Sequence, residues 1–391
     1  MLQALQSELA QRKENGLLRQ RRLLDSPQAE HIVANNQHFL SFCSNDYLGL
    51  ANHPALVKAM QKAAGDSGVG SGASNLITGH HRYHDELEKQ LAKFVGLPAA
   101  LLFSTGYMAN IGVLGALVGR GDAIFADKLN HACLNDGGYY SLAEFHRFAH
   151  NDVAALEKLL KESNARHKFI AVDAVFSMDG DIAPIPVYLA LCEKYDAYLY
   201  IDDAHGFGVL GPHGEGTLAH FQSSKNMAKS PRIMMMATLG KAAGVAGAFV
   251  AGESVVIDYL IQTAKSYVYS TPAPPALSAT LQASVKLIET GDHLRTHLSD
   301  LINYFKKNLN LKKWHLLPSE TSIQPLIVGG NLEALALSEY LQTQGILVPA
   351  IRPPTVPQNT ARLRISLSAA HTTQDIDRLV AAIMQAEQSL S

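Results

Sequence analysis

Two acidic residues and a histidine directly follow an apolar stretch near the middle of the chain. Residues 200–206 read Tyr-Ile-Asp-Asp-Ala-His-Gly, so Asp202 and His205 come where a predicted strand, Tyr198–Ile201, ends. In open α/β sheets, ligands bind at the carboxyl ends of the strands. The pattern therefore predicts a functional site, although taken alone a helix N-cap with a structural histidine fits it equally well.

Lys241 stands in a setting that suits amine chemistry. It follows the predicted strand Ile233–Ala237 and lies among small residues, in Thr-Leu-Gly-Lys-Ala-Ala-Gly. A lone lysine is usually a solvated surface charge, but glycine and alanine neighbours leave room for a close ligand. Burial lowers the pKa of an amine and makes the neutral nucleophile available for a Schiff base. We therefore expect Lys241 to hold pyridoxal phosphate and Asp202 to pair with its pyridine nitrogen.

A phosphate group needs its own binding site, and residues 104–110 suit that purpose. This Ser-Thr-Gly-Tyr-Met-Ala-Asn segment follows the predicted strand Ala99–Phe103 and places Gly106 and Tyr107 at the start of a helix. Backbone N–H groups at a helix N-terminus bind phosphate. An ordinary Ser/Thr N-cap followed by a glycine turn is the alternative interpretation.

Two other motifs suggest ligands but lack the required context. Gly68–Gly72 resembles a dinucleotide-binding loop, but helical residues precede it where that motif requires a strand. His80 and His84 have the spacing of metal ligands on a helix, but no carboxylate or cysteine completes a convincing set. We expect no metal, and a loop leading into a capped helix at residues 80–84.

The elements that must position these side chains alternate along the chain. Short apolar runs alternate with helical segments such as Val153–Leu160, which is typical of an α/β protein with a mostly parallel central sheet and helices on both faces. A smaller C-terminal α+β domain is expected to follow. We predict an N-terminal helix and arm (1–45), a large α/β domain (46–275) and a small domain (276–391). The runs that predict strands of the large domain are Ala99–Phe103, Ala123–Phe125, Phe169–Val172, Tyr198–Ile201, Ile233–Ala237 and Ala248–Val250.

The composition limits the partners and the compartment. With 33 Lys and Arg against 35 Asp and Glu, the net charge of −2 provides no basic field for nucleic acid or an anionic membrane. Cys43, Cys133 and Cys192 are widely separated and form no disulfide framework. No apolar run approaches the roughly 20 residues that span a bilayer. A cytoplasmic protein without nucleic-acid or membrane partners is expected.

Four segments together resemble the α-oxoamine synthase family of fold-type I pyridoxal-phosphate enzymes. They are Ser44–Leu50, Ser177–Asp181, Asp202–Gly206 and Gly240–Lys241, and both their order and their spacing agree with the family. The resemblance extends from about Leu17 to the final helix. It implies a pyridoxal-phosphate-dependent acyltransferase that joins an amino acid to an acyl thioester, working as a homodimer with shared active sites.

The resemblance also implies roles for individual residues. Lys241 would carry the cofactor and transfer protons, His131 would stack on the ring, and His205 would hydrogen-bond the phenolic oxygen. The cofactor's phosphate or ring edge would be contacted by Gly106, Tyr107, Ser177 and Thr238, and the neighbouring subunit's phosphate by Ser270 and Thr271. Taken alone, His131 could be a helix cap and Ser270 part of a simple turn.

The segment Ile351–Pro357 narrows the choice of substrates. Its Ile-Arg-Pro-Pro-Thr-Val-Pro sequence resembles family members that join L-alanine to a pimeloyl thioester of coenzyme A or of an acyl carrier protein. Arg352 would hold the amino-acid carboxylate, and Arg19 would lie near the acyl chain. Asp173 stands where relatives usually carry glutamate, and we expect it to point into the cofactor cleft. Glycine C-acetyltransferase, 5-aminolevulinate synthase and a non-catalytic cofactor- or dinucleotide-binding protein remain alternatives.

Overall fold

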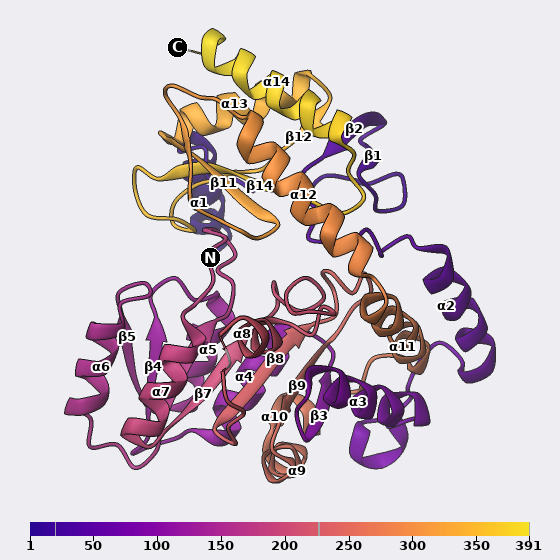
Figure 1. Cartoon of the computed structure of the whole chain (residues 1–391), viewed down its shortest axis with the longest axis vertical. Coiled ribbons are helices and arrows are strands. Elements are labelled where there is room, and N and C mark those ends of the chain that lie inside the picture. The colour runs from indigo at the N-terminus through magenta and orange to yellow at the C-terminus, as the bar shows by residue number, and fades with distance from the viewer. Residues whose placement is uncertain (20, 226, 391) are drawn as a thin grey trace.

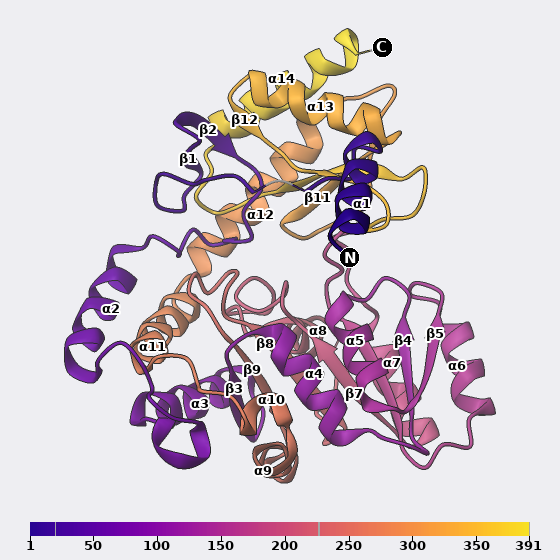
Figure 2. The same cartoon turned by 180° about the vertical axis from the view of Figure 1, so that it is seen from behind.

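The chain folds into a larger and a smaller body, one above the other (Figures 1 and 2). A computed structural model describes residues 1–19, 21–225 and 227–390. The larger body is built on the central sheet, and the smaller one contains the C-terminal third of the chain. The N-terminal helix α1 (Leu2–Glu14) lies against the smaller body. None of its residues is buried.

The central sheet has seven strands in the order β3-β9-β8-β7-β6-β4-β5. Strand β9 is antiparallel to both of its neighbours, and the pairings from β8 to β5 are all parallel. The parallel strands therefore end at one edge, where ligands are expected. The strands are β3 (Ala99–Phe103), β4 (Ala123–Asp127), β5 (Glu144–Phe148), β6 (Lys168–Asp173), β7 (Ala197–Asp202), β8 (Ile233–Thr238) and β9 (Ala248–Gly252).

Helices cover both faces of this sheet, so its central strands are buried almost completely. Helix α4 is prominent on the face seen in Figure 2, and α7 and α8 lie on the face seen in Figure 1. The α-helices of the larger body are α2 (Pro54–Ser67), α3 (Arg82–Val95), α4 (Gly106–Leu117), α5 (Ala132–Ser141), α6 (Val153–Glu162), α7 (Ile185–Tyr195), α8 (Thr217–Lys225), α9 (Ser254–Thr263), α10 (Lys265–Val268) and α11 (Pro275–Glu289), with a π-helical turn at Asn75–Gly79.

The smaller body has an antiparallel sheet in the order β10-β11-β14-β13. Its strands are β10 (His315–Leu316), β11 (Ile323–Gly329), β13 (Ala350–Ile351) and β14 (Ala361–Ser366). Its helices are α12 (Asp292–Asn308), α13 (Asn331–Thr343) and α14 (Thr373–Ser389). In α14, Ile376, Leu379, Val380 and Ile383 form the buried face that the apolar spacing predicts.

A third sheet joins a segment near the N-terminus to the smaller body. Strands β1 (His31–Ala34) and β2 (Gln37–Ser41) form a hairpin, and β12 (Ile346–Leu347) pairs with β2 in parallel. Asn35 and Asn36 make the two-residue turn with φ of 50° and 60°, a conformation that asparagine tolerates well. The residues just before the larger body are therefore hydrogen-bonded to the smaller one.

The predicted fold class is confirmed: a mostly parallel sheet with helices on both faces accompanies a smaller α+β body. The Gly68–Gly72 segment follows helix α2 and not a strand, so the strand that a dinucleotide-binding motif requires is absent at this place. The predicted capped helix is also present, since His81 caps α3 together with His84. The boundaries of the three predicted domains remain predictions.

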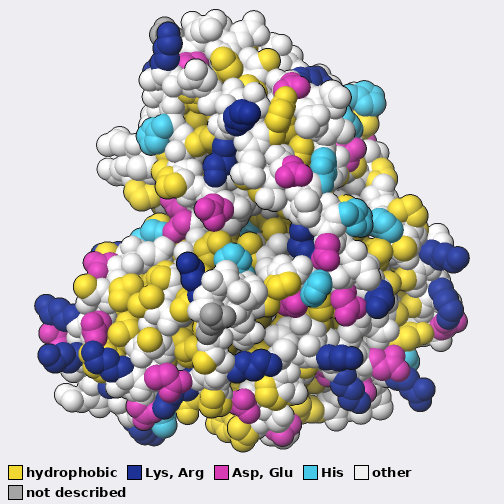
Figure 3. All heavy atoms as spheres, in the orientation of Figure 1, with side chains coloured by type: hydrophobic (Ala, Val, Ile, Leu, Met, Phe, Trp, Pro, Cys, Tyr) yellow, Lys and Arg dark blue, Asp and Glu magenta, His cyan; other side chains and the backbone are white. Residues whose placement is uncertain are grey.

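The surface agrees with the mixed composition. On the face shown in Figure 3, Lys and Arg side chains are interspersed with Asp and Glu, and the outline narrows between the two bodies. Among the described residues, no helix is long and apolar enough to cross a membrane. Nor do these residues include a cluster of three or more His, Cys, Asp or Glu side chains that could hold a metal ion.

Candidate active site

A cavity opens at the carboxyl edge of the central strands. Asp173 and Asp202 are paired in register at the ends of the adjacent strands β6 and β7, and both border this cavity. Lys241 reaches it from the turn between β8 and β9. The full lining is Gly106, Tyr107, His131, Cys133, Asp173, Val175, Ser177, Asp202, Ala204, His205, Met236, Thr238 and Lys241. Most of the residues predicted from the sequence therefore meet in one place.

Lys241 is the first member of a chain of polar contacts. Its Nζ lies 2.8 Å from Nε2 of His205, and Nδ1 of His205 lies 2.6 Å from the Tyr47 hydroxyl. Because an ammonium group can only donate, His205 accepts at Nε2 and donates from Nδ1 when the lysine is charged. The tautomer of His205 is therefore tied to the protonation state of Lys241.

Burial changes the acidity of both groups. Desolvation lowers the pKa of Lys241 to about 8, although the carboxylate of Asp202 opposes this change. Desolvation and the neighbouring Lys241 charge hold the pKa of His205 well below its usual value. The imidazole is thus neutral at physiological pH, and a much larger fraction of Lys241 is a free amine than of an ordinary solvated lysine.

Asp202 is held from behind by two buried side chains. The Tyr200 hydroxyl donates to Oδ1 of Asn110 at 2.7 Å, and Nδ2 of Asn110 donates to Oδ2 of Asp202 at 2.7 Å. The phenol thereby fixes which end of the Asn110 amide faces Asp202. The backbone N–H of Ala204 donates to the other oxygen, Oδ1, at 3.0 Å. The carboxylate is therefore fixed at the floor of the cavity.

His131 and Asp173 form the adjoining wall. His131 caps helix α5, which is the alternative role considered for it from the sequence. It also borders the cavity. Its backbone N–H donates to Oδ2 of Asp173 at 3.0 Å, while Oδ1 of Asp173 is buried and has no hydrogen-bond partner among the described residues. Desolvation, followed by the charge of Asp202, raises the pKa of Asp173 well above its usual value. Asp173 is therefore suited to being a neutral acid.

The part of the cavity bordered by the start of helix α4 suits a phosphate group. Thr105 caps helix α4 by accepting from the backbone N–H of Met108 at 3.1 Å, so the N-cap interpretation is correct as far as Thr105 is concerned. The first N–H groups of α4, those of Gly106 and Tyr107, have no acceptor within the helix and border the cavity. Thr238 borders the same region. An anion site, an amine and a fixed carboxylate thus line one cavity, which fits pyridoxal phosphate.

Four predicted site residues lie outside this lining. Ser270 and Thr271 border a separate pocket beside helix α3. Arg19 and Arg352 share another hollow near helix α1, where a guanidinium N–H of Arg352 donates to the carbonyl of Gly16.

An intermediate hollow connects the cavity with the arginine pair. It shares His131 and Ser177 with the cavity, and Pro354 and Thr355 with the hollow around Arg352. The three hollows are therefore neighbours, and together they extend from the cavity beside Lys241 to Arg19 and Arg352.

Arg364, Tyr47 and Asn45 were given no role in the sequence analysis. Arg364 donates to the backbone carbonyl of Ser177 at 2.5 Å, to Oδ1 of Asn45 at 3.1 Å and to the Tyr47 hydroxyl at 3.4 Å. It is only 5% exposed. The local pattern gave no signal, because Arg362, Arg364 and Ser366 alternate with apolar residues in β14 and therefore resemble the outer face of a half-buried strand.

Comparison with known proteins agrees with this geometry. Residues 37–383 match the family described as aminotransferase class I and II. The 8-amino-7-oxononanoate synthase of Methylobacillus flagellatus is 56% identical over 100% of this chain and 97% of its own length. That of Nitrosomonas europaea is 54% identical over 99% of this chain and 100% of its own.

Solved structures show the same fold. Serine palmitoyltransferase from S. paucimobilis, with a bound PLP–myriocin aldimine, has a TM-score of 0.91 at 26% identity and covers 99% of this chain and 97% of its own. The 8-amino-7-oxononanoate synthase from Francisella tularensis has a TM-score of 0.77 at 28% identity. The match covers 90% of this chain and 98% of that one. With relatives above half identity along its whole length, the chain belongs to the 8-amino-7-oxononanoate synthase family within aminotransferase class I and II.

Proposed function

We propose that this chain uses pyridoxal phosphate to condense L-alanine with a pimeloyl thioester, releasing the thiol and carbon dioxide and forming 8-amino-7-oxononanoate for biotin biosynthesis. The thioester is that of coenzyme A or of an acyl carrier protein. The observation that carries the proposal is the meeting of Lys241, His205, Asp202 and His131 in one cavity of a chain that is 54–56% identical to synthases of this name.

The chain's own residues explain how such a reaction is assisted. Bound pyridoxal phosphate draws electrons away from the amino acid's α-carbon, which makes loss of a proton and of carbon dioxide possible. Lys241, with its lowered pKa of about 8, can take up a proton in the cavity and return it near neutral pH. His205 keeps Nζ of Lys241 in place, and Asp202 supplies the negative charge that a protonated ring nitrogen requires.

The amino-acid carboxylate has two candidate partners. Arg352 is the residue expected from the resemblance, and it lies in the hollow shared with Arg19. Arg364 contacts Tyr47, which contacts His205, and the charge of Arg364 contributes to the lowered pKa of Lys241. We favour Arg364 for the carboxylate, and we place Arg352 with Arg19 on the path of the acyl chain.

The complete site requires two copies of the chain. Ser270 and Thr271 lie outside the cavity of their own chain, which supports the proposal that they act on the neighbouring subunit's phosphate. A cytoplasmic homodimer is the form proposed, in agreement with free Cys43, Cys133 and Cys192.

A substrate panel tests the function. Purified protein loaded with pyridoxal phosphate receives L-alanine or glycine with pimeloyl or acetyl thioesters, and thiol and carbon dioxide are measured together. We expect equal release of both products, with L-alanine and pimeloyl thioester giving the highest kcat/KM. A preference for glycine and acetyl-CoA would instead indicate glycine C-acetyltransferase, and absence of turnover with every pair would indicate a non-catalytic protein.

A further inference from the structure

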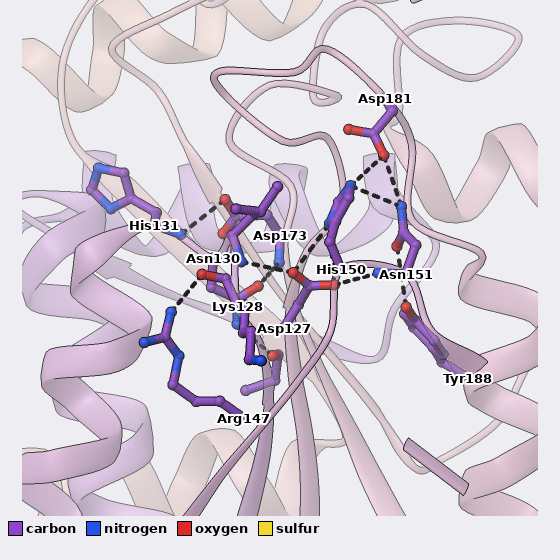
Figure 4. A network of polar contacts seen from close by, with 12 residues as sticks. Asp127, Lys128, Asn130, His131, Arg147, His150, Asn151, Asp173, Asp181 and Tyr188 are labelled. Carbon is purple, nitrogen blue, oxygen red and sulfur yellow. Dashed lines mark hydrogen bonds and ion pairs between the residues drawn. The ribbon is translucent and has the colours of Figure 1, made fainter. Parts of the chain in front are cut away.

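A charged cluster lies just outside the cavity lining. His150 follows strand β5 and stands between Asp127, at the end of β4, and Asp181, in the loop after β6 (Figure 4). Its Nδ1 lies 3.1 Å from Oδ1 of Asp127, and its Nε2 lies 2.8 Å from Oδ2 of Asp181. Each ring nitrogen therefore faces a carboxylate, and only the doubly protonated ring can donate to both.

The surroundings favour this charged form. Burial alone would lower the pKa of His150, but the hydrogen bonds and charges of Asp127 and Asp181 outweigh burial and raise it to about 10. Asp127 is fully buried, and Phe176 packs edge-on against the His150 ring with centroids 4.4 Å apart. Titratable groups on the other surrounding elements are Asp152 at the start of α6, Asp173 on β6 and Tyr188 on α7.

Asp127 also shapes the turn that leads to His131. Its Oδ1 accepts from the backbone N–H of Leu129 at 2.8 Å, and its backbone carbonyl accepts from the N–H of Asn130 at 3.2 Å. His131 comes next and borders the cavity. A displaced Asp127 side chain would therefore loosen the turn that places His131.

Asp181 closes the loop that carries Ser177. Its backbone carbonyl accepts from the N–H of Phe176 at 3.0 Å, and Ser177 borders the cavity within the enclosed loop. Asn151 reinforces the His150 contact by donating to Oδ2 of Asp181 at 2.7 Å. From the smaller body, Arg362 donates to Oδ1 of Asp179 at 2.8 Å.

We propose that His150 is a positioning residue whose ring, bridging Asp127 and Asp181, holds the two loops that place His131 and Ser177 at the cavity. The importance of His131 and Ser177 for catalysis rests on the proposed function. Whether His150 holds the two loops in place does not depend on the proposed function. The rigidity of the loops is therefore measured separately from turnover.

The first experiment compares His150→Gln with a matched control, His146→Gln. His146 lies on the neighbouring strand β5, and its side chain is 38% exposed. Hydrogen exchange at pH 7 is followed by mass spectrometry in segments 127–131 and 176–181. We expect exchange in both segments to rise about tenfold or more in His150→Gln and to remain unchanged in His146→Gln. Binding of pyridoxal phosphate to the cofactor-free chain should weaken about tenfold in the same variant.

A milder variant covers the case in which His150→Gln does not fold. Asp181→Asn keeps the His150 contact with Asp127, so it should speed exchange in segment 176–181 and leave segment 127–131 much closer to wild type. Adding Asp181→Asn to a folded His150→Gln chain should partly restore stability, because it removes one of the two negative charges that have lost the cationic ring between them.

The wild-type chain provides an independent check by pH. A histidine with a raised pKa stabilises the fold fully below its ordinary value of 6.5, and this stabilisation is lost as the pH rises through about 10. Protection of both segments, corrected for intrinsic exchange, should fall over that range. Two results would overturn the proposal, even if turnover had changed. One is unchanged exchange in segment 176–181 of Asp181→Asn. The other is equal exchange in His150→Gln and His146→Gln.

Discussion

Nζ of Lys241 lies 2.8 Å from Nε2 of His205, a contact that joins the only lysine bordering the described cavity to a buried imidazole. Because a neutral imidazole nitrogen accepts the contact, it does not itself oppose a proton on the lysine. The lowered lysine pKa instead follows from burial first. Burial therefore sets the pH range over which the amine can react, and His205 fixes the position of Nζ.

The pH dependence of cofactor attachment tests this arrangement. Only the neutral amine attacks an aldehyde, so covalent capture of pyridoxal phosphate by the cofactor-free chain should increase with pH and level off above about 8 rather than near 10.5. Capture is followed by visible absorbance. Lys241→Ala is the control and should show neither the absorbance nor turnover. A midpoint at or above pH 10 would mean that Lys241 is not desolvated.

The Asp202 carboxylate should depend on the two residues behind it. Asp202→Asn removes the negative charge that we propose pairs with the ring nitrogen, and it should abolish most turnover while leaving the fold intact. Tyr200→Phe leaves Oδ1 of Asn110 without its donor and permits the amide to turn. Loss of a buried hydrogen bond costs about 1–3 kcal/mol, so we expect kcat to fall about tenfold.

Tyr198→Phe is the matched control for Tyr200→Phe. Tyr198 lies on the same strand, stacks on Phe169 and does not border the cavity. Its kcat should equal that of the wild type. If Tyr200→Phe also keeps wild-type kcat, Asn110 holds Asp202 without help from the phenol.

Much of the cavity lining could be predicted from the sequence, because these residues lie at the ends of strands. Asp202, Asp173 and Lys241 each follow or end an apolar strand, and parallel strands bring such residues to one edge. Strand β5 was missed because it lies at the sheet edge and carries Glu144, His146 and Arg147. Charged residues protect an exposed edge and obscure the apolar pattern.

Contacts between distant segments were beyond sequence reasoning. Tyr47 and Arg364 are 317 positions apart, and nothing in the local pattern of either one indicates the other. The same holds for the pairing of β2 with β12, where each strand is too short for an apolar repeat to identify its partner. Such contacts form because both bodies pack together, which is a property of the whole fold.

Mixing two defective variants tests the shared active site. Lys241→Ala lacks the amine, whereas a chain with Ser270→Ala and Thr271→Ala keeps its amine and loses the proposed phosphate contacts to its partner. Unfolding and refolding the two together should create mixed dimers with one intact site, so activity should reappear. Each variant refolded alone is the control. Mass spectrometry shows whether the mixture contains mixed dimers. If it does and activity still fails to reappear, Ser270 and Thr271 lie outside the neighbouring subunit's site.

Asp173 offers a test of a buried neutral acid. Its raised pKa means that the folded chain keeps a proton which the unfolded chain releases near 3.8. The associated stabilisation is therefore full below that pH and is lost as the pH rises through the folded-state pKa. Asp173→Asn carries no charge at any pH and can still accept from the His131 N–H. The asparagine variant should accordingly be at least as stable as the wild type at pH 8, by urea unfolding, with the difference shrinking toward pH 4.

Turnover should separate the acid's role from its hydrogen bond. Asp173→Ala leaves the His131 N–H without the acceptor that now lies 3.0 Å away, which costs about 1–3 kcal/mol and should lower kcat about tenfold or more. Asp173→Glu keeps a carboxyl group, one methylene further from the backbone, and should change kcat much less, since a water can bridge small differences in reach. If asparagine supports turnover as well as glutamate does, accepting from His131 is the function of this side chain. If only glutamate does, the proton on the acid takes part in the reaction. Wild-type kcat in the alanine variant would remove Asp173 from the site altogether.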